Sequence, residues 1–210
     1  MSWYEEVEKR STIVTPEILK ISMPRAPKVD SWASAFDLAL FQRGIDSPHD
    51  VAMFLAQVGH ESADLTRLKE SLWYSAERLV EVWPSRFPTL DSAYPYAENP
   101  EALANNVYGD RLGNVEPGDG FRFIGRGPIQ LTGRYNYTRC QEATGLPLLE
   151  RPELLATDPG FGTVSAVWYW SEHVTPGADI ETATRQINGG LNGLDDRRER
   201  FLRTLRHMVE

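Results

Sequence analysis

The strongest constraint on the fold is a helix-start signal that recurs along the chain. In Ser47-Pro48-His49-Asp50, a capping serine precedes a proline at the first helical position, and an acidic residue follows in the first turn. Apolar residues then recur at helical spacing, as at Val51, Leu55 and Val58. This pattern predicts capped amphipathic helices. Related starts occur at Thr15-Pro16, Ser75-Ala76, Asn99-Pro100 and Asp158-Pro159, and glycines that end helices occur at Gly44, Gly109 and Gly145.

Only one part of the sequence, from Phe121 to Leu131, looks extended. It contains Gly125, Gly127 and Pro128, so it supports one short strand or an ordered loop and no more. The rest of the pattern predicts about eight or nine helices. We therefore expect an all-α fold with at most one short strand or hairpin, and we find no interdomain linker.

Composition and charge narrow the class of protein. Apolar residues make up 41% of the chain and charged residues 25%, which is typical of a soluble globular protein. The net charge of −8 argues against binding of nucleic acid, whose recognition needs a basic face, and gives no general attraction to an anionic cell wall. One segment is basic, and we interpret it as a solvated helix face rather than a wall-binding patch. It carries Arg197, Arg198, Arg200, Arg203 and Arg206.

The N-terminal residues and the cysteine content indicate where such a chain folds. Residues 1–6 show no basic start, apolar run or cleavage site of a secretory signal. The apolar stretches of the sequence are too short to span a bilayer. We therefore expect synthesis and folding in a cytoplasm, without stable membrane insertion. Because Cys140 is the single cysteine, no intramolecular disulfide can form, and packing must hold the fold together.

A first polar cluster, Gly59-His60-Glu61-Ser62, interrupts an apolar helix. Glu61 lies three residues after Val58, on or beside the stripe that faces the core. Apolar walls there would favour a protonated carboxyl group, as a general acid requires. A salt bridge at the helix end explains this segment equally well. A zinc protease helix would need a second histidine where Asp64 stands, and with four histidines in all we expect no metal and no cofactor.

A second cluster contains Glu70, nine residues after Glu61 and across an expected turn. Glycosidases need two carboxyl groups flanking the scissile bond, one protonated and one ionised. Glu70, which we expect to be the more solvated of the two, is suited to be the base. The pairing alone is a weak signal, because the chain has 30 acidic residues that offer many such pairs.

The third cluster runs from Phe123 to Tyr137. Its two glycines and its proline fix an unusual backbone path that we expect to bring polar and aromatic side chains together. Amides and hydroxyls beside aromatic rings suit a neutral sugar chain. The alternative is an aromatic-rich loop packed on the core, and we favour the functional interpretation. The side chains are Gln130, Thr132, Tyr135 and Asn136.

Taken together, these segments resemble glycoside hydrolase family 19, the group of plant chitinases and of bacterial and phage cell-wall lysins. The match follows the family's order over roughly residues 50 to 205. The Gly-Arg-Gly-Pro-Ile-Gln-Leu run is its most specific part. The matching pieces are His60-Glu61, Glu70, Gly125 to Thr132, Ile187-Asn188-Gly189-Gly190 and Asp196-Arg197.

The resemblance implies a two-lobed, lysozyme-like helical fold with the sugar chain in a cleft between the lobes. By matching positions, Glu61 would be the general acid, Glu70 the general base, and Thr132 would help Glu70 to hold the attacking water. The family inverts the anomeric centre, so the two carboxyl groups should stand far enough apart to admit water. Gln130, Tyr135, Asn136 and Asn188 would line the sugar sites, and Arg197 would sit near Glu61.

The sequence also differs from the pattern of the family that it resembles. Plant chitinases have disulfides, and they have a glutamate where this chain has Asn192, so the surroundings of Glu61 and Arg197 are expected to differ. Lysins often have asparagine in place of Trp73, so the resemblance assigns Trp73 no role. We expect residues 1–210 to form a single catalytic domain, with residues 1–45 as an N-terminal helical cap on a core of residues 46–210.

We expect a monomeric endolysin that hydrolyses β-1,4 bonds of peptidoglycan as a muramidase. It would be made in the host cytoplasm and would need a holin-like pore to reach the wall in the periplasm. One alternative is a bacterial chitinase. Another is a non-catalytic glycan-binding protein, against which the presence of both Glu61 and Glu70 speaks. A peptidase lacks a zinc set and a nucleophile–base pair around Cys140.

Overall fold

The computed structural model describes residues 11–210, and they form a helical protein, as expected. Within these described residues, nine helices have seven or more residues, and three short α-helices and one 3-10 helix join them. The elements are α2 (Pro16–Ser22), α3 (Val29–Gln42), α4 (Pro48–Glu61), α5 (Ala76–Val82), α6 (Leu90–Ala93), η1 (Tyr94–Tyr96), α7 (Pro100–Tyr108), α8 (Asp119–Arg122), α9 (Arg134–Thr144), α10 (Leu154–Thr157), α11 (Pro159–His173), α12 (Ile180–Asn188) and α13 (Leu194–Val209).

The helix-start signals are confirmed. Helix α4 begins directly after Ser47, whose Oγ accepts a hydrogen bond of 3.0 Å from the backbone N–H of Asp50. This contact satisfies one of the amide groups that a helix leaves without a partner in its first turn. The same arrangement caps α2, α5, α7 and α11, with Thr15, Ser75, Asn99 and Asp158 as the capping residues.

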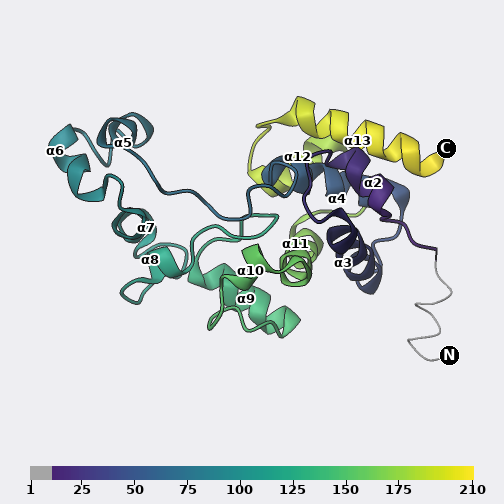
Figure 1. The fold of residues 1–210 in the computed structure, drawn as a ribbon, viewed down its shortest axis with the longest axis horizontal. Coiled ribbons are helices and arrows are strands. Elements are labelled where there is room, and N and C mark those ends of the chain that lie inside the picture. Colours follow the sequence, from purple (N-terminus) through teal and green to yellow (C-terminus); the bar gives the residue numbers. More distant parts are fainter. Residues whose placement is uncertain (1–10) are drawn as a thin grey trace.

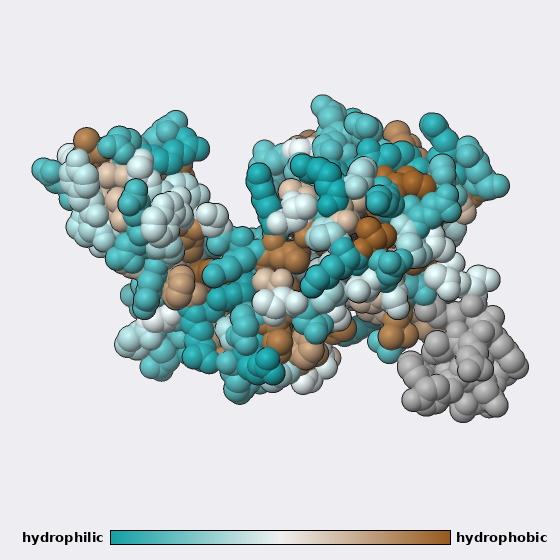
Figure 2. All heavy atoms as spheres, in the orientation of Figure 1, coloured by the Kyte–Doolittle hydropathy of each residue, from teal (hydrophilic) through white to brown (hydrophobic). Residues whose placement is uncertain are grey.

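The helices form two lobes separated by a hollow. Helices α5, α6, α7 and α8 make a small lobe, and α2, α3, α4, α11, α12 and α13 make a large one (Figure 1). Figure 2 shows an open hollow between the two lobes. The segment between α4 and α5 crosses from the large lobe to the small lobe along the floor of this hollow (Figure 1). Residues on that segment are therefore placed to face anything that occupies it.

Each lobe has its own apolar core. In the large lobe, Phe54 of α4 makes edge contacts with Phe36 and Trp170, at centroid distances of 5.5 and 5.6 Å. In the small lobe, Leu79, Phe87 and Leu103 are among the buried residues. Helices α2 and α3 belong to the core of the large lobe. They lie within the expected N-terminal cap, of which residues 1–10 fall outside the described part of the chain.

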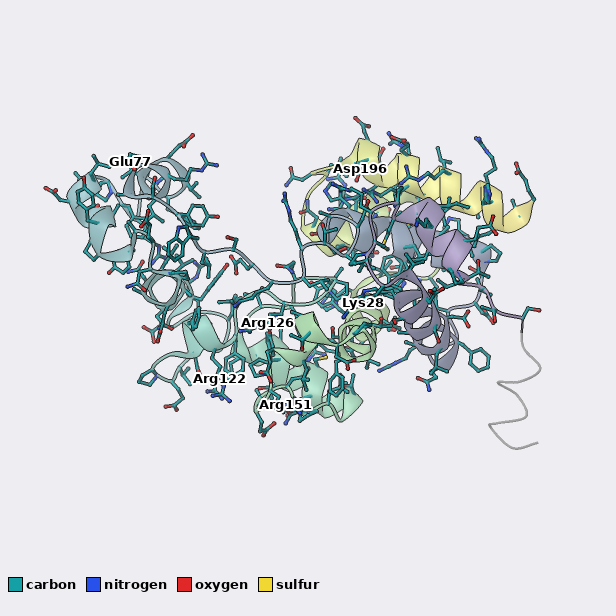
Figure 3. The ribbon with its side chains drawn as sticks, in the orientation of Figure 1. Lys28, Glu77, Arg122, Arg126, Arg151 and Asp196 are labelled. Atoms are coloured by element: carbon teal, nitrogen blue, oxygen red, sulfur yellow. The ribbon has the colours of Figure 1, made fainter. Side chains whose placement is uncertain are left out.

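The segment from Phe121 to Leu131 begins differently from the expectation. Phe121 and Arg122 are the last residues of α8 and are not extended. Beyond them lies an ordered loop with two isolated antiparallel bridges, Lys69 to Arg126 and Arg126 to Leu131, and no longer strand within residues 11–210. Figure 3 labels Arg126 on this loop, between the two lobes.

The arginine-rich end of the chain corrects another expectation. Arg197 and Arg200 of α13 are buried, so the interpretation of this segment as a solvated face is wrong for both. They turn inward because α4 and the loop after it present carboxylates to them, Glu61 and Asp64. Leu202 of the same helix is 51% exposed.

Within residues 11–210, none of the helices is long and apolar enough to cross a bilayer.

Candidate active site

Glu61, the predicted acid, is the last residue of α4 and contacts a buried arginine. Nη2 of Arg197 donates a hydrogen bond of 2.5 Å to Oε1 of Glu61. The Arg197 side chain is 1% exposed and that of Glu61 is 23% exposed. The residue that contacts Glu61 is thus a charged one, and the salt bridge that the sequence left as an alternative is present. Arg197 lies next to Glu61, as the family resemblance implied.

Gln57, which the sequence analysis missed, completes the surroundings of Arg197. Oε1 of Gln57 accepts a hydrogen bond of 2.5 Å from Nη1 of Arg197, and the carbonyl of Asn192 accepts one of 3.1 Å from Nε. Nε2 of Gln57 in turn donates to Oγ1 of Thr184 at 3.0 Å. Among these partners only Glu61 is a carboxylate, and Asn192 contributes its backbone. The one available signal was a polar residue inside the apolar run of α4.

The loop after Glu61 has an unusual backbone. Ala63, Asp64 and Leu65 all have left-handed φ angles, of 49°, 62° and 61°. Such angles are costly for residues other than glycine and persist only where surrounding contacts hold them. One contact is local, since Oγ of Ser62 accepts a hydrogen bond of 2.8 Å from the N–H of Leu65. This loop sets the path of the chain from Glu61 to Glu70.

The carboxylate of Asp64 stabilises the same loop through contacts with two arginines. It accepts hydrogen bonds from Nη1 of Arg200 at 2.5 Å and from Nε of Arg25 at 3.0 Å. Burial opposes the ionisation of Asp64, but the hydrogen bonds from Arg25 and Arg200 outweigh it and hold its pKa below the ordinary value. The ion pair therefore joins α13 to the loop between the two predicted catalytic residues.

His60 belongs to the same network of polar contacts. Its Nδ1 lies 2.7 Å from Oδ2 of Asp196, which also accepts a hydrogen bond of 2.8 Å from Nε of Arg200. Figure 3 labels Asp196 near the start of α13. Within the described residues, no three side chains of His, Cys, Asp or Glu gather in a way that could hold a metal ion.

Glu70, the predicted base, is held by the small lobe and by the loop after α8. The hydroxyl of Tyr108, at the end of α7, donates a hydrogen bond of 2.6 Å to Oε1 of Glu70. The backbone N–H of Gly125 donates to Oε2 at 3.3 Å, and the N–H of Glu70 donates to the carbonyl of Gly125 at 2.9 Å. Burial and the nearby carboxylate raise the pKa of Tyr108, so its hydroxyl keeps its proton.

Three predicted site residues meet at Gly125. A Cβ atom at this position would lie 3.0 Å from Oε1 of Gln130, 3.2 Å from Oγ1 of Thr132 and 3.4 Å from Cβ of Glu70. A larger residue would therefore crowd all three side chains. Oγ1 of Thr132 donates a hydrogen bond of 2.9 Å to the carbonyl of Gln130, which leaves its lone pairs free to accept one.

The remaining predicted binding residues are less closely grouped. Nδ2 of Asn136 donates to the carbonyl of Thr132 at 2.8 Å, so this side chain supports the loop. Tyr135 is 58% exposed, and its N–H donates to the carbonyl of Leu112. Asn188 lies on the large lobe, as the last residue of α12, and its buried Nδ2 has no hydrogen-bond partner in the described structure. The sequence grouped these residues in one site, whereas the structure places Asn188 on the large lobe and uses the Asn136 side chain to support the loop.

Two tyrosines near the site had no signal in the sequence. Tyr108 holds Glu70, as described above. The pKa of Tyr169, on α11, is raised by burial and by the charge of nearby Glu61. Both are half-buried aromatic residues on helices, and no motif around them separates them from core residues. Tyr108 thus contacts one of the two predicted catalytic carboxylates, Glu70, and Tyr169 lies near the other, Glu61.

Comparison with known proteins places the chain in a family. A family model described as chitinase class I matches residues 86–191. A protein of Haemophilus influenzae, described as a glycosyl hydrolase family 19 domain-containing protein, is 42% identical over 149 residues, which is 70% of this chain and 74% of that protein. Endochitinase 1 of Theobroma cacao is 49% identical over 132 residues, which is 60% of this chain but only 34% of the plant protein.

Solved structures share the fold. Chitinase C from Streptomyces griseus HUT6037 aligns with a TM-score of 0.64 and 21% identity, over 96% of this chain and 95% of that one. A class IV chitinase from Zea mays aligns with a TM-score of 0.62 and 18% identity, over 95% and 94%. The family model covers half of the chain, and the Haemophilus relative is matched over most of its length. The chain therefore belongs to glycoside hydrolase family 19.

Proposed function

We propose that this glycoside hydrolase is an endolysin of the muramidase type, which cleaves β-1,4 bonds of peptidoglycan with inversion. The observation that carries the proposal is the different attachment of the two carboxylates. Glu61 is bound to Arg197 within the large lobe, whereas Glu70 is bound to Tyr108 of the small lobe. A sugar chain lying in the hollow between the lobes would have one carboxyl group on each side, as glycoside hydrolysis requires.

The proposed roles follow from this arrangement. Glu61 donates a proton to the oxygen of the leaving sugar, while Glu70 takes a proton from a water molecule that attacks the anomeric carbon from the other face. Oγ1 of Thr132 accepts a hydrogen bond from that water, because its own proton is already donated to the carbonyl of Gln130. Gln130, Tyr135, Asn136 and Asn188 line the sugar sites.

Synthesis in a host cytoplasm is favoured by the way the protein is held together. Its one cysteine, Cys140, is buried, and burial raises the pKa of the thiol to about 12. The fold thus needs no oxidising compartment, which suits synthesis in a host cytoplasm. We propose that residues 1–210 act as one monomeric catalytic domain, with residues 1–45 as its N-terminal part, and that a holin-like pore gives it access to the periplasmic wall.

A bacterial chitinase is the second candidate. It is favoured by the solved structures that share the fold, which are described as chitinases. The same carboxylates would act on a polymer of N-acetylglucosamine. A non-catalytic glycan-binding protein is a weaker alternative, because such a protein would not need two carboxylates held by specific partners.

Fragment analysis separates these candidates. Purified peptidoglycan and colloidal chitin are each incubated with the protein, and the released fragments are identified by mass spectrometry. Reducing ends at muramic acid support the proposal, and reducing ends at glucosamine would make the enzyme a glucosaminidase. Release from chitin alone favours the chitinase. Glu61→Gln keeps the shape of the side chain but removes its transferable proton, so it is the control, with at least about a hundredfold less release expected.

A further inference from the structure

Trp73 is an exposed tryptophan that neither the fold nor the proposed catalytic roles explain. Its side chain is 63% exposed, although the next residue toward the N-terminus, Leu72, is buried at 3%. It lies near the end of the segment that crosses from α4 in the large lobe to α5 in the small lobe (Figure 1). A large aromatic side chain left in solvent at such a place is a candidate binding surface.

Trp73 also lines a cavity beside the predicted base. The cavity has a volume of about 400 Å³, within the range of small-ligand sites. The small-lobe core supplies Leu72 and Ile124, which are buried, and Phe121 packs against that core. Glu70 borders the same space. Its lining residues are Lys69, Glu70, Ser71, Leu72, Trp73, Pro100, Phe121 and Ile124.

The lining defines the kind of ligand that would fit. The indole, the proline ring and the phenyl ring present apolar surface, and the Glu70 carboxylate accepts hydrogen bonds. A ring with an apolar C–H face and hydroxyl or amide groups at its edge matches both parts. The lining also includes Lys69 and Ser71, whose ammonium and hydroxyl groups can donate hydrogen bonds to the same hydroxyl or amide groups.

Trp73 is not needed to hold the small lobe together. Trp83, by contrast, makes ring contacts with Tyr74 at 5.3 Å and Phe87 at 6.5 Å. Among residues 11–210, Trp73 has no comparable ring contact. Loss of the indole should therefore affect ligand binding more than folding.

We propose that Trp73 is a sugar-stacking residue, which receives the face of an N-acetylhexosamine ring of the glycan strand next to the bond served by Glu70. This inference rests on the proposed function, because it assumes that a glycan strand occupies the hollow. It adds a specificity-determining residue at a position where the family resemblance gives none.

The test measures binding in the absence of cleavage. Trp73→Ala, Trp73→Phe and Tyr94→Ala are each made in the Glu61→Gln protein, and binding of a chitohexaose and of soluble peptidoglycan strands is followed by isothermal titration calorimetry. Tyr94 is a matched control, since it is an exposed aromatic residue, at 58%, on η1 and outside the cavity. Circular dichroism confirms that each variant is folded.

The expected result is a loss of affinity of about threefold to tenfold for Trp73→Ala, with most of the affinity kept by Trp73→Phe and all of it by Tyr94→Ala. Unchanged binding by folded Trp73→Ala, while the Glu61→Gln parent binds glycan, would overturn this inference and leave the proposed function standing. If the parent binds neither glycan, the proposed function and this inference are both wrong.

Discussion

Arg197 and Glu61 form an ion pair in which Nη2 of the arginine donates to Oε1 of the glutamate at 2.5 Å, and the arginine is almost entirely buried. The two residues are far apart in the sequence but join α13 to the end of α4. A guanidinium in such a place needs acceptors for its N–H groups. Glu61 is one acceptor, and the side chain of Gln57 and the carbonyl of Asn192 are the others.

This relationship predicts that Arg197 matters for stability as well as for activity. Arg197→Met should lower the free energy of unfolding by about 2–4 kcal/mol, because it leaves buried acceptors on Gln57 and Asn192 without a donor and Glu61 without its counter-charge. Urea denaturation followed by circular dichroism measures the change. Arg198→Met is the control, since Arg198 is 41% exposed and its ion-pair distances are 3.4 and 3.5 Å. Equal stability of the two variants would contradict this account of the buried pair.

Asp64 predicts a dependence of stability on pH. A carboxyl group whose pKa is lower in the folded than in the unfolded protein stabilises the fold above the unfolded pKa, and this contribution is lost as the pH falls through the folded pKa. The pKa of Asp64 is lowered from 3.8, so its contribution should be complete at neutral pH and disappear in acid.

The measurement compares wild type with Asp64→Asn by urea denaturation from pH 7 down to the lowest pH at which the wild type still folds. The variant should be less stable at pH 7, and the difference should narrow as the pH falls below about 4. Asp195→Asn is the matched control, because the Asp195 side chain is fully exposed. A difference between Asp64→Asn and wild type that stays constant over the whole range would show that the charge of Asp64 is not what stabilises the loop.

The sequence predicted those features of the fold that depend on neighbouring residues. Ser47 caps α4 through a contact with Asp50, three residues away, and such a contact can be read from a short motif. The convergence of Gln130 and Thr132 near Glu70 was expected in part, because the glycines of the loop restrict its path.

Contacts between distant parts of the chain were not predictable in the same way. The pairing of Gln57 with Arg197 joins residues 140 positions apart, and hydrophobic periodicity carries no information about it. Periodicity also favoured a solvated face for Arg200, because a charged residue is placed outside unless its partner is known. That partner, Asp64, lies on a loop whose left-handed backbone the sequence did not indicate.

Glu70 and Thr132 are predicted to contribute unequally to catalysis. Glu70→Gln should remove most activity while leaving glycan binding largely intact, because a base acts mainly in the transition state. Thr132→Ala should cost about tenfold to a hundredfold, because the threonine only orients the water. Turbidity clearing of outer-membrane-permeabilised Gram-negative cells reports the rates. If Thr132→Ala were as damaging as Glu70→Gln, the threonine would have to do more than orient water.

The stereochemistry of the product tests the role of Glu70 most directly. If Glu70 activates water for direct attack, the first product of a β-linked substrate must be the α-anomer. A retaining enzyme would instead place its second carboxyl group about 5 Å from the acid and form a covalent intermediate. The attachment of Glu61 to the large lobe and of Glu70 to Tyr108 of the small lobe favours the wider spacing. Proton NMR during the first minutes of hydrolysis of a soluble chitooligosaccharide or peptidoglycan fragment, before mutarotation, distinguishes the two. An initial β-anomer would remove Glu70 from the role of base, and the α-anomer is the expected result.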